Sequence, residues 1–358
     1  MLDTIAVVFE VSPQSLALIK THFSTVHYYP KGKIPAELVG DVEVWFCNWL
    51  GIPRWISPEM LTRAQVVQLT SAGANHAFEC PALKDRDVQR RVKVCTASGV
   101  HVLSIPAYII GQIIGFYQNI HTSITVTRTH GRWPRRDELA LNRDTGADLR
   151  KFGTLGLINL RGKVVGMLGY GHIARETARL LAAFGCEIVA ANTAGEKSRC
   201  GGYIIEGTGD VEGDIPTAWY STRDVASFDK FLSRSDILVA SLPSTPQTRG
   251  MLTREHLAKL PPKALFINVG RGDLVASEAI LAALNEGTLL GAGLDVTDPE
   301  PLPDGHPLLT HPRVVITPHT SADFEGYFDA GAELLVENIE NMRRGGEPYN
   351  VVDPEKGY

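Results

Sequence analysis

A glycine-rich turn between an apolar run and a helical pattern constrains this chain more than any other feature. Residues 169–174 read G-Y-G-H-I-A and directly follow the apolar run Val164–Leu168. The residues after the turn carry alanine and leucine at helical spacing. A G-x-G-x-x-A sequence with a strand before it and a helix after it is typical of dinucleotide-binding domains. Gly169 permits the tight turn, and Gly171 lets the backbone approach a pyrophosphate.

The start of the helix after this turn is the expected phosphate site. Ala174 keeps the helix and the strand close together. Backbone amides at a helix N-terminus attract anions, so we expect those of His172 and Ile173 to bind the phosphates. The alternative is a purely structural turn, which the strand and the helix on either side disfavour.

The end of the next strand bears on which dinucleotide binds. Enzymes that use NAD place a carboxylate about 20 residues after the fingerprint, where it hydrogen-bonds the ribose 2′-hydroxyl. Here that place is taken by the neutral Asn192, and Thr193, Lys197 and Arg199 follow it. The missing carboxylate removes the repulsion against a 2′-phosphate, and the basic residues offer donors. The sequence therefore favours NADP(H) over NAD(H). Alternatively, Lys197 and Arg199 only solvate a long, glycine-rich loop.

Two series of short apolar runs predict an α/β protein. The first series comprises Thr4–Phe9, Val42–Cys47, Val66–Thr70 and Val92–Thr96. The second comprises Val164–Leu168, Glu187–Ala191, Ile237–Leu242, Leu265–Val269, Gly291–Val296 and Val314–Thr317. Near-continuous apolar strands are typical of a parallel sheet covered on both faces, so the second series predicts a doubly wound Rossmann sheet.

Two helical patterns mark where the chain passes between domains. Apolar residues recur at helical spacing over residues 105–121, which lead out of the first domain, and over residues 327–343, which return to it. We therefore predict a discontinuous substrate domain and a dinucleotide-binding domain. Their predicted ranges are 1–104 with 323–358, and 105–322.

Composition and charge exclude several classes of protein. Of the 358 residues 44% are hydrophobic, which is enough for real cores and excludes a disordered chain. The 40 acidic residues outnumber the 35 basic ones, whereas nucleic-acid binding normally needs a basic face. Five cysteines without a C-x-x-C pair indicate neither a disulfide framework nor a metal site, and fit reduced thiols in the cytoplasm. Polar residues interrupt the uncharged stretch Val94–Thr127, so we expect no membrane span and no membrane partner.

Polar residues stand at the ends of three predicted strands, where ligands bind in an open parallel sheet. Arg271, Asp295 and His319 occupy these places, and Glu300 follows Asp295 in a proline-rich loop. Each residue taken alone has a structural alternative, such as a surface turn or a solvated loop. Together, a guanidinium, carboxylates and an imidazole beside a nicotinamide would suffice for carbonyl reduction.

Four motifs, in this order along the chain, resemble the D-isomer-specific 2-hydroxyacid dehydrogenase family: GYGHIA, INVGRG, LDVTDPEPLP and ITPHTS. The likeness covers almost the whole chain. Fungal members of the glyoxylate/hydroxypyruvate reductase type are the most similar, because they share the segments GTGDVEGDIPTAWY and NVVDPEKGY. The resemblance implies a Rossmann domain with a flavodoxin-like substrate domain. It also implies an NAD(P)-dependent interconversion of a small 2-keto acid and its D-2-hydroxy acid.

Matched position by position, the resemblance implies a role for each site residue. Arg271 looks like the arginine that binds the substrate, His319 like the general acid and base, and Glu300 like the carboxylate that orients the imidazole. Asp295 resembles the aspartate that contacts the nicotinamide carboxamide. Further cofactor contacts are implied for Leu242, Pro243, Thr248, Val269, Arg271 and His319, and substrate contacts for Ser71, Ala72, Gly73, Arg271 and His319.

The chemistry of the reaction supports these roles independently. Hydride transfer to a 2-keto carbon builds negative charge on the carbonyl oxygen, so an imidazolium must donate a proton and a cation must hold the oxygen. His319 suits the first task. Arg271 suits the second, because a planar guanidinium binds a carboxylate in two places and lysine cannot.

Several questions stay open at this level. The family implies a homodimer, for which residues 128–145 are either a contact arm or a solvated linker. Ala107 stands where many relatives carry a glutamate. Trp49 and Leu50 either line the substrate pocket or pack in the core, and glyoxylate, hydroxypyruvate and aromatic or branched 2-keto acids all remain possible. The alternative function is a cofactor-sensing, corepressor-like scaffold of the same fold.

Overall fold

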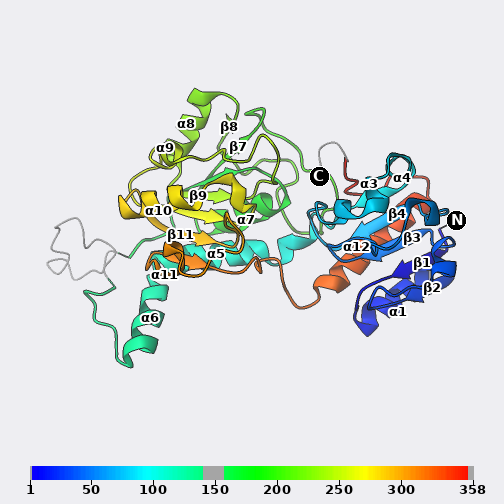
Figure 1. Ribbon diagram of the computed structural model, residues 1–358. Helices are drawn as coiled ribbons and strands as arrows, with labels where there is room; N and C mark the ends of the chain where they lie inside the picture. The colour runs from blue at the N-terminus through cyan, green and yellow to red at the C-terminus, as the bar shows by residue number, and fades with distance from the viewer. Residues whose placement is uncertain (1, 140–156, 354–358) are drawn as a thin grey trace. The chain divides into compact units, whose positions relative to one another are not determined.

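The computed structural model describes residues 2–139 and 157–353, which form two compact units (Figure 1). Unit 1 is drawn from Met1–Leu103, Gly201–Gly207 and Asp323–Tyr358. Unit 2 is drawn from Ser104–Cys200 and Thr208–Ala322. The chain therefore passes between the units at four points.

The short segment 201–207 lies in unit 1, whereas the sequence prediction left it with the dinucleotide-binding domain. The backbone N–H of Tyr203 donates to Asn350 Oδ1 at 3.2 Å, and the rings of Tyr203 and Tyr349 are 6.1 Å apart. Gly99 has φ +98°, and a Cβ atom there would overlap the carbonyl group of Tyr203. These contacts join residues far apart in the chain, so periodicity does not reveal them.

Unit 1 contains a five-stranded parallel sheet in the order β2-β1-β3-β4-β5. This is the flavodoxin-like strand order. The strands are β1 Thr4–Val7, β2 Thr25–Tyr28, β3 Val44–Cys47, β4 Val66–Leu69 and β5 Lys93–Cys95. The sequence prediction missed β2, because this edge strand is at most half-buried and lacks an apolar run.

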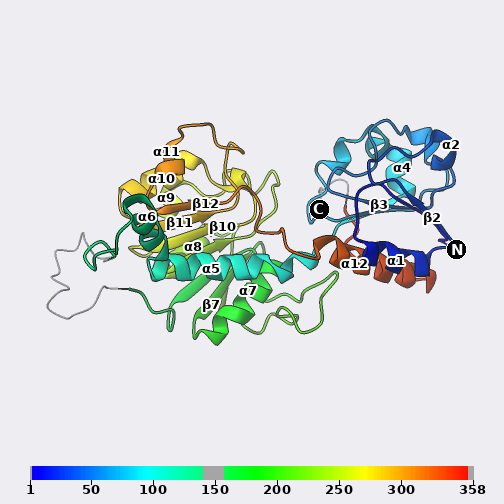
Figure 2. The same cartoon turned by 90° about the horizontal axis from the view of Figure 1, so that it is seen from below.

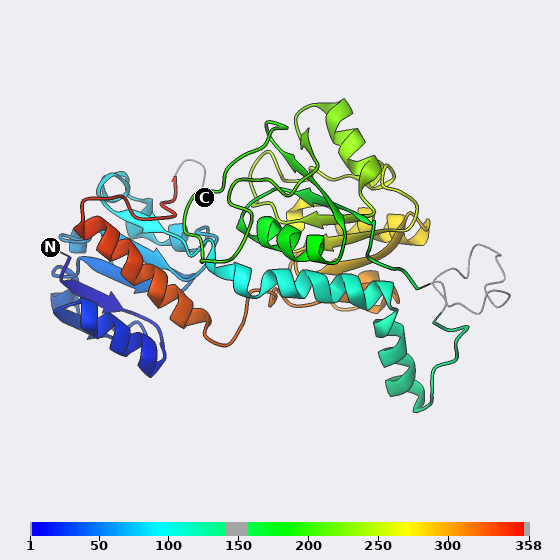
Figure 3. The same cartoon turned by 180° about the vertical axis from the view of Figure 1, so that it is seen from behind.

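Helices cover both faces of this sheet. On one face α1 and α12 lie side by side (Figure 3). Their residues Ile19 and Leu335 pack with Phe46. On the other face Val88 packs with Trp45, the strand neighbour of Phe46. The helices of unit 1 are α1 Pro13–His22, α2 Ala36–Val39, α3 Pro81–Lys84, α4 Arg86–Arg91 and α12 Tyr327–Arg343.

Unit 2 contains a seven-stranded parallel sheet in the order β12-β11-β10-β9-β6-β7-β8. The strands are β6 Val164–Leu168, β7 Glu187–Asn192, β8 Ala218–Ser221, β9 Ile237–Ala240, β10 Ala264–Asn268, β11 Leu289–Leu294 and β12 Val314–Ile316. The order reverses between β6 and β9, which is the Rossmann arrangement and the expected place for a ligand. The edge strand β8 was missed, because it is mostly half-exposed.

Both faces of the second sheet are also covered. Helices α5 and α7 cover one face (Figure 2). There they pack with Val165 and Met167 of β6. Leu238 and Ala240 of β9 pack with α8, α9 and α10 on the other. The helices are α5 Ile105–Tyr117, α7 His172–Ala183, α8 Val225–Arg234, α9 Arg254–Leu257, α10 Ser277–Asn285 and α11 Pro307–Thr310. The predicted α/β class, with a doubly wound Rossmann sheet and a flavodoxin-like sheet, is confirmed.

The helix expected over residues 105–121 is divided in two. α5 ends at Tyr117, and α6 spans Ile120–His130 after Asn119, whose φ of 50° turns the chain. None of the residues of α6 is buried. The proposed contact arm 128–145 begins at the end of α6, and its residues 140–145 lie outside the described residues.

The described residues also form four short 3₁₀ helices: Pro58–Met60, Ala77–Glu79, Val100–Leu103 and Gly272–Leu274. Across residues 2–139 and 157–353, no helix has the length and apolar character needed to cross a membrane. The same residues hold no cluster of metal-ligating side chains. None of the five cysteines, which all lie within these ranges, forms a disulfide.

Candidate active site

The glycine-rich turn leaves room for a phosphate group at the carboxyl end of β6. Gly169 has φ +86°, and a Cβ atom there would lie 2.8 Å from the side chain of Leu242, so only glycine fits without displacement. At Gly171 an added Cβ atom would meet no heavy atom within 4 Å. Gly171 thus borders open space at the position where a dinucleotide backbone would approach.

The helix that starts at this turn lacks a side-chain cap. Gly171 is the N-cap of α7 and provides no side-chain hydrogen bond, whereas Ser12, Asp85 and Asp224 cap α1, α4 and α8. The helix starts with His172 and Ile173, and Ala174 is fully buried against the sheet. The free backbone N–H groups of an uncapped helix N-terminus, next to a glycine without a side chain, can bind the pyrophosphate of a dinucleotide.

Asn192 stabilises the turn that follows β7. Its Nδ2 donates to the carbonyl of Glu196 at 2.7 Å, and its Oδ1 accepts from the N–H of Gly195 at 2.6 Å. The exposed residues Thr193, Lys197 and Arg199 lie on the loop beyond it. Lys197 forms an ion pair with Asp214, and Arg199 forms one with Glu212 at 3.1 Å.

The loop after β9 packs against both glycine-rich loops. A Cβ atom at Gly270 would lie 2.6 Å from the carbonyl oxygen of Leu242, so the two backbones are in close contact. Thr248 Oγ1 donates to the carbonyl of Pro243 at 2.6 Å and thereby closes the loop. Val269 is buried at the end of the neighbouring β10. The residues expected beside the adenosine and nicotinamide therefore share one edge of the sheet.

Hydrogen bonds of the Asn268 side chain and one close backbone contact hold the loop that carries Arg271. The buried Asn268 accepts from the N–H of Gly270 at 3.1 Å and donates to the carbonyl of Arg271 at 3.0 Å. A Cβ atom at Gly272 would overlap the backbone of Thr297. The side chain of Arg271 donates from Nη1 to the carbonyl of Gly270 at 2.8 Å. Glycine on both sides of Arg271 thus allows neighbouring loops to hold its backbone.

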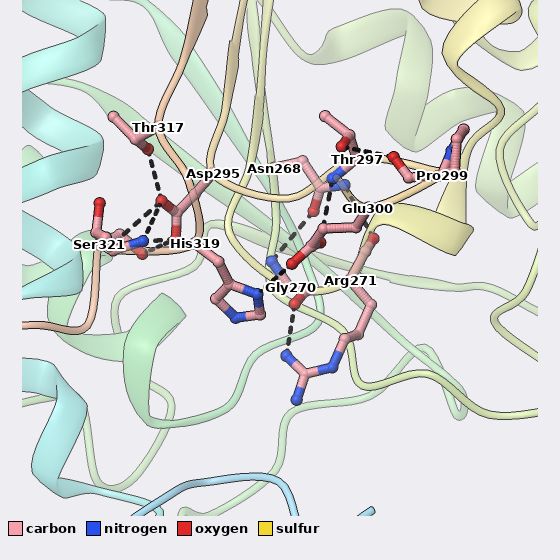
Figure 4. A network of polar contacts seen from close by, with 11 residues as sticks. Asn268, Gly270, Arg271, Asp295, Thr297, Pro299, Glu300, Thr317, His319 and Ser321 are labelled. Carbon is pink, nitrogen blue, oxygen red and sulfur yellow. Dashed lines mark hydrogen bonds and ion pairs between the residues drawn. The ribbon is translucent and has the colours of Figure 1, made fainter. Parts of the chain in front are cut away.

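His319 and Glu300 form a hydrogen-bonded pair. Nδ1 of the imidazole lies 2.7 Å from Oε1 of Glu300, and both side chains are about two-fifths exposed, at 44% and 41%. Figure 4 shows this imidazole and the guanidinium of Arg271 reaching the same side of the strand ends. The structure therefore brings an imidazole–carboxylate pair and a guanidinium to one edge of unit 2.

A buried carboxylate holds the turn on which His319 lies. Asp295 is 2% exposed, and its Oδ1 accepts from the backbone N–H of Thr320 at 2.9 Å and from Thr317 Oγ1. Both carboxylate oxygens also accept from the N–H of Ser321 at 3.1 Å. The N–H of His319 donates to the carbonyl of Asp295 at 2.9 Å, and His319 has φ 56°. Backbone in this left-handed region is uncommon for residues other than glycine, and here the surrounding bonds hold it.

Three residues of this network were not predicted from the sequence as site residues: Tyr108, Thr317 and Ser321. Thr317 Oγ1 lies 2.9 Å from the hydroxyl of Tyr108 on α5, as well as bonding Asp295. Burial raises the pKa of Tyr108 to about 12, so this hydroxyl stays protonated and can donate to Thr317. The threonine and serine belong to the motif ITPHTS, but the tyrosine has no local signal.

The residues expected to meet the substrate in unit 1 follow its central strands. Ser71 Oγ donates to the carbonyl of Gly73 at 2.6 Å, which closes a tight loop with Ala72 after β4. Trp49 and Leu50 follow β3 and are 49% and 44% exposed. These two side chains therefore do not pack in the core of unit 1.

A family model matches half of the chain. The model describes the D-isomer specific 2-hydroxyacid dehydrogenase, NAD binding domain, and it matches residues 141–321. This range contains the phosphate turn, the loop of Arg271 and the turn of His319.

Two curated relatives and one solved structure are similar over most of the chain. A hydroxypyruvate reductase of Blautia hydrogenotrophica is 31% identical over 326 residues, or 88% of this chain and 86% of that enzyme. A glyoxylate reductase of Thermofilum pendens is 30% identical over 291 residues, or 81% of this chain and 75% of that enzyme. The crystal structure of a D-isomer specific 2-hydroxyacid dehydrogenase of Xanthobacter autotrophicus in complex with NADPH and MES covers all of both chains, with 25% identity and a TM-score of 0.71.

Proposed function

Because this chain belongs to the D-isomer specific 2-hydroxyacid dehydrogenase family, we propose that it reduces a small 2-keto acid to the D-2-hydroxy acid, and catalyses the reverse, with NADP(H). An NAD(P)-dependent dehydrogenase of this family needs a proton donor and a cation beside the nicotinamide. The observation that carries the proposal is the 2.7 Å contact of His319 Nδ1 with Glu300, on the same edge of the sheet as Arg271.

In the proposed mechanism His319 exchanges a proton with the substrate oxygen. Its Nδ1–H donates to Glu300, so Nε2 is the nitrogen that carries the transferred proton. The bound nicotinamide supplies or accepts the hydride. In reduction His319 enters protonated and donates from Nε2 as charge develops on the oxygen; in oxidation the neutral ring accepts the proton from the hydroxyl. Glu300 stabilises the imidazolium and keeps the ring oriented.

Arg271 holds the substrate for this exchange. Its guanidinium binds the carboxylate through two N–H groups and lies near the carbonyl oxygen that becomes charged. The contact of Gly272 with Thr297 holds the arginine near Glu300, because both Thr297 and Glu300 lie on the loop after β11. The resemblance assigns Ser71, Ala72 and Gly73 to the substrate carboxylate as well, and this stays a prediction.

In this proposal Asp295 does more than contact the cofactor. Both of its oxygens already accept hydrogen bonds from Thr317, Thr320 and Ser321. We assign it to positioning: it holds the turn that presents His319. Contact of Asp295 with the nicotinamide carboxamide, which the resemblance implies, stays a prediction.

The proposed preference for NADP(H) depends on the end of β7. Asn192 carries no charge that would repel a 2′-phosphate, and Lys197 and Arg199 lie on the same exposed loop. Exposed ion pairs such as theirs with Asp214 and Glu212 are weak, so a phosphate dianion can replace the acidic partners. The related Xanthobacter enzyme was crystallised with NADPH, which agrees with this preference.

The substrate proposal is a small 2-keto acid of the glyoxylate and hydroxypyruvate class, which the names of the two relatives support. The exposed Trp49 and Leu50 would then limit the size of the substrate side chain. We further propose that the protein acts as a homodimer, since α6 buries no residue and exposes Ile120 and Ile124. The absence of disulfides among the five described cysteines fits the cytoplasmic location that the sequence predicts.

One plate of reactions tests the function. The loss of reduced-cofactor absorbance is followed with NADPH and with NADH across glyoxylate, hydroxypyruvate, and branched and aromatic 2-keto acids. Turnover of glyoxylate or hydroxypyruvate, faster with NADPH, supports the proposal. Cofactor binding without turnover of any 2-keto acid would favour the corepressor-like scaffold instead.

A further inference from the structure

Arg175 is buried beneath the glycine-rich turn and uses its whole guanidinium within the protein. It is the fourth residue of α7 and is 2% exposed. Nε donates to the carbonyl of Tyr170 at 2.9 Å, and Nη1 donates to the carbonyls of Asp210 at 2.5 Å and Val211 at 3.5 Å. Nη2 donates to the carbonyl of Ser198 at 2.7 Å and to its Oγ at 3.2 Å. A guanidinium has five N–H groups, so all of them are engaged.

The acceptors of Arg175 belong to three separate segments of backbone. Tyr170 lies in the phosphate turn, Ser198 in the loop after β7, and Asp210 in the loop that leads to β8. One planar cation thus fixes the positions of these segments relative to one another. Lysine offers a point charge with three donors and cannot reproduce this geometry.

The side chains around Arg175 strengthen the same connection. The guanidinium carbon lies 4.7 Å from the centre of the Tyr170 ring, and the hydroxyl of Tyr170 donates to Asp210 Oδ2 at 2.8 Å. The carboxylate of Asp210 also accepts from the N–H groups of Asp214 and Ile215 at 2.9 and 3.0 Å. These hydrogen bonds outweigh burial and lower the pKa of Asp210, so it is a carboxylate at neutral pH.

Glu176, the next residue of α7, also binds the loop that leads to β8, but it accepts a hydrogen bond where Arg175 donates. Oε2 of Glu176, a side chain buried on α7, accepts from the N–H of Gly209 at 2.6 Å. Arg175 therefore binds carbonyl groups of the loops, and Glu176 binds an N–H group. Neither residue lies on the exposed surface or in the catalytic network of His319.

The consequence concerns the two exposed basic residues on either side of Ser198. Lys197 and Arg199 extend from backbone that Arg175 holds at Ser198. Asp214, the ion-pair partner of Lys197, lies on backbone that Asp210 holds. The separation between the phosphate turn and the basic residues is therefore set by Arg175.

We propose that Arg175 is a positioning residue for cofactor selectivity, which fixes the distance between the pyrophosphate turn and the basic loop that recognises the 2′-phosphate. This inference rests on the proposed NADP(H) function of the same site. It predicts that loss of Arg175 weakens recognition of the 2′-phosphate more than recognition of the rest of the nucleotide.

The test compares two nucleotide fragments that differ by one phosphate. Adenosine 2′,5′-bisphosphate and adenosine 5′-monophosphate are titrated calorimetrically into the full chain, as wild type and as Arg175→Lys. Arg254→Lys is the matched control, because Arg254 is an exposed arginine of the same unit that pairs with Glu286 on the surface. Hydrogen exchange of residues 193–200 and 208–215 is measured on the same samples.

In the wild type and the control we expect the bisphosphate to bind more tightly than the monophosphate. In Arg175→Lys this preference falls by about tenfold or more, the usual worth of a charge-assisted hydrogen bond, while monophosphate affinity changes by less than about twofold. The amides of residues 193–200 and 208–215 exchange faster. If Arg175 only stabilised the fold, the variant would bind both fragments more weakly to the same degree.

Two results would overturn the inference. If Arg175→Lys keeps the wild-type preference for the bisphosphate, Arg175 does not position the loop for recognition of the 2′-phosphate. If the variant loses affinity for both fragments equally, Arg175 serves nucleotide binding in general. If the wild type shows no preference for the bisphosphate, the NADP(H) proposal fails in the wild type itself and the positioning role falls with it. Should Arg175→Lys not fold, Glu176→Gln decides by the same ratio, because it weakens the bond to Gly209, together with the ion pair to Arg179, and leaves Arg175 in place.

Discussion

Oε1 of Glu300 lies 2.7 Å from Nδ1 of His319, so this contact engages one nitrogen of the imidazole and leaves Nε2 for the proposed proton transfer. Glu300 reaches the histidine from the loop after β11, and His319 itself follows β12. The pair therefore depends on two neighbouring strands of the same sheet ending at the same edge.

Replacing His319 by alanine is expected to remove the proton donor and leave the nucleotide site intact. We predict that kcat of His319→Ala falls by about 10²–10⁴-fold, the usual contribution of general acid–base catalysis. The dissociation constant for NADPH, measured by fluorescence titration, should change by less than about threefold. The reason is that the phosphate turn follows β6, whereas His319 follows β12. His22→Ala, in α1 of unit 1, is the control. Loss of NADPH affinity as large as the loss of activity would contradict the assignment.

Arg271→Lys tests whether substrate binding needs the planar guanidinium group of the arginine. A lysine keeps the charge but binds a carboxylate through a single point, so we expect kcat/KM for the 2-keto acid to fall by about 10²–10³-fold. NADPH affinity and the unfolding midpoint should stay close to the wild type. The control is Arg254→Lys, whose side chain forms a surface ion pair with Glu286. A variant with wild-type KM and kcat would exclude Arg271 from substrate binding.

Asn192→Asp should shift the cofactor preference toward NADH. The new carboxylate repels a 2′-phosphate and accepts hydrogen bonds from a 2′-hydroxyl, and the variant also loses the donor to the carbonyl of Glu196. We expect the ratio of kcat/KM for NADPH to that for NADH to fall by at least about tenfold, as for one charged hydrogen bond. Asn159→Asp, in an exposed turn before β6, serves as the control. An equal or greater preference for NADPH would overturn the role given to Asn192.

Glu43 gives a prediction for the pH dependence of stability. Burial favours its neutral form, but the N–H groups of Asp3 and Thr4 and the guanidinium of Arg63 outweigh burial and lower its pKa. A lowered folded-state pKa stabilises the protein above the unfolded pKa of about 4.3, and this stability is lost as pH falls.

Glu43→Gln is therefore expected to lower the free energy of unfolding at pH 7 by about 1–3 kcal/mol, the cost of losing hydrogen bonds to a charged group. The difference from wild type, measured by urea titration, should shrink toward pH 3.5. Glu37→Gln, on the exposed side of α2, is the control. A difference that stays constant between the two pH values would contradict the charged role of Glu43.

The sequence predicted the strands of both cores and the residues that end them, because a parallel strand buried on two faces must be apolar and its end is then easy to recognise. Arg271, Asp295 and His319 all follow from that pattern. β2 and β8 escaped it, since edge strands are partly exposed and carry polar residues.

Contacts between distant elements were beyond sequence reasoning. Tyr108 reaches Thr317 across 209 positions of sequence, and nothing near the tyrosine indicates this. Arg175 likewise bonds carbonyl groups of Ser198 and Asp210, which have no side-chain pattern to find. Such residues depend on how loops fold back over a helix, which periodicity does not describe.

Gly272 provides a final test of how the site is held, because it carries no functional group of its own. A methyl group there would overlap the carbonyl group of Thr297, so Gly272→Ala must push the loop of Arg271 away from the loop of Glu300. Displacement of a catalytic group by about 1 Å can cost about 10²-fold in rate, and we expect a loss of kcat/KM of that size. NADPH binding should persist, since Gly171 and α7 follow β6, whereas the loop of Gly272 follows β10. Gly111→Ala, in α5, adds a methyl group where no atom lies within 4 Å and should leave activity unchanged. Wild-type kcat/KM in Gly272→Ala would mean that the two loops need not be in contact for catalysis.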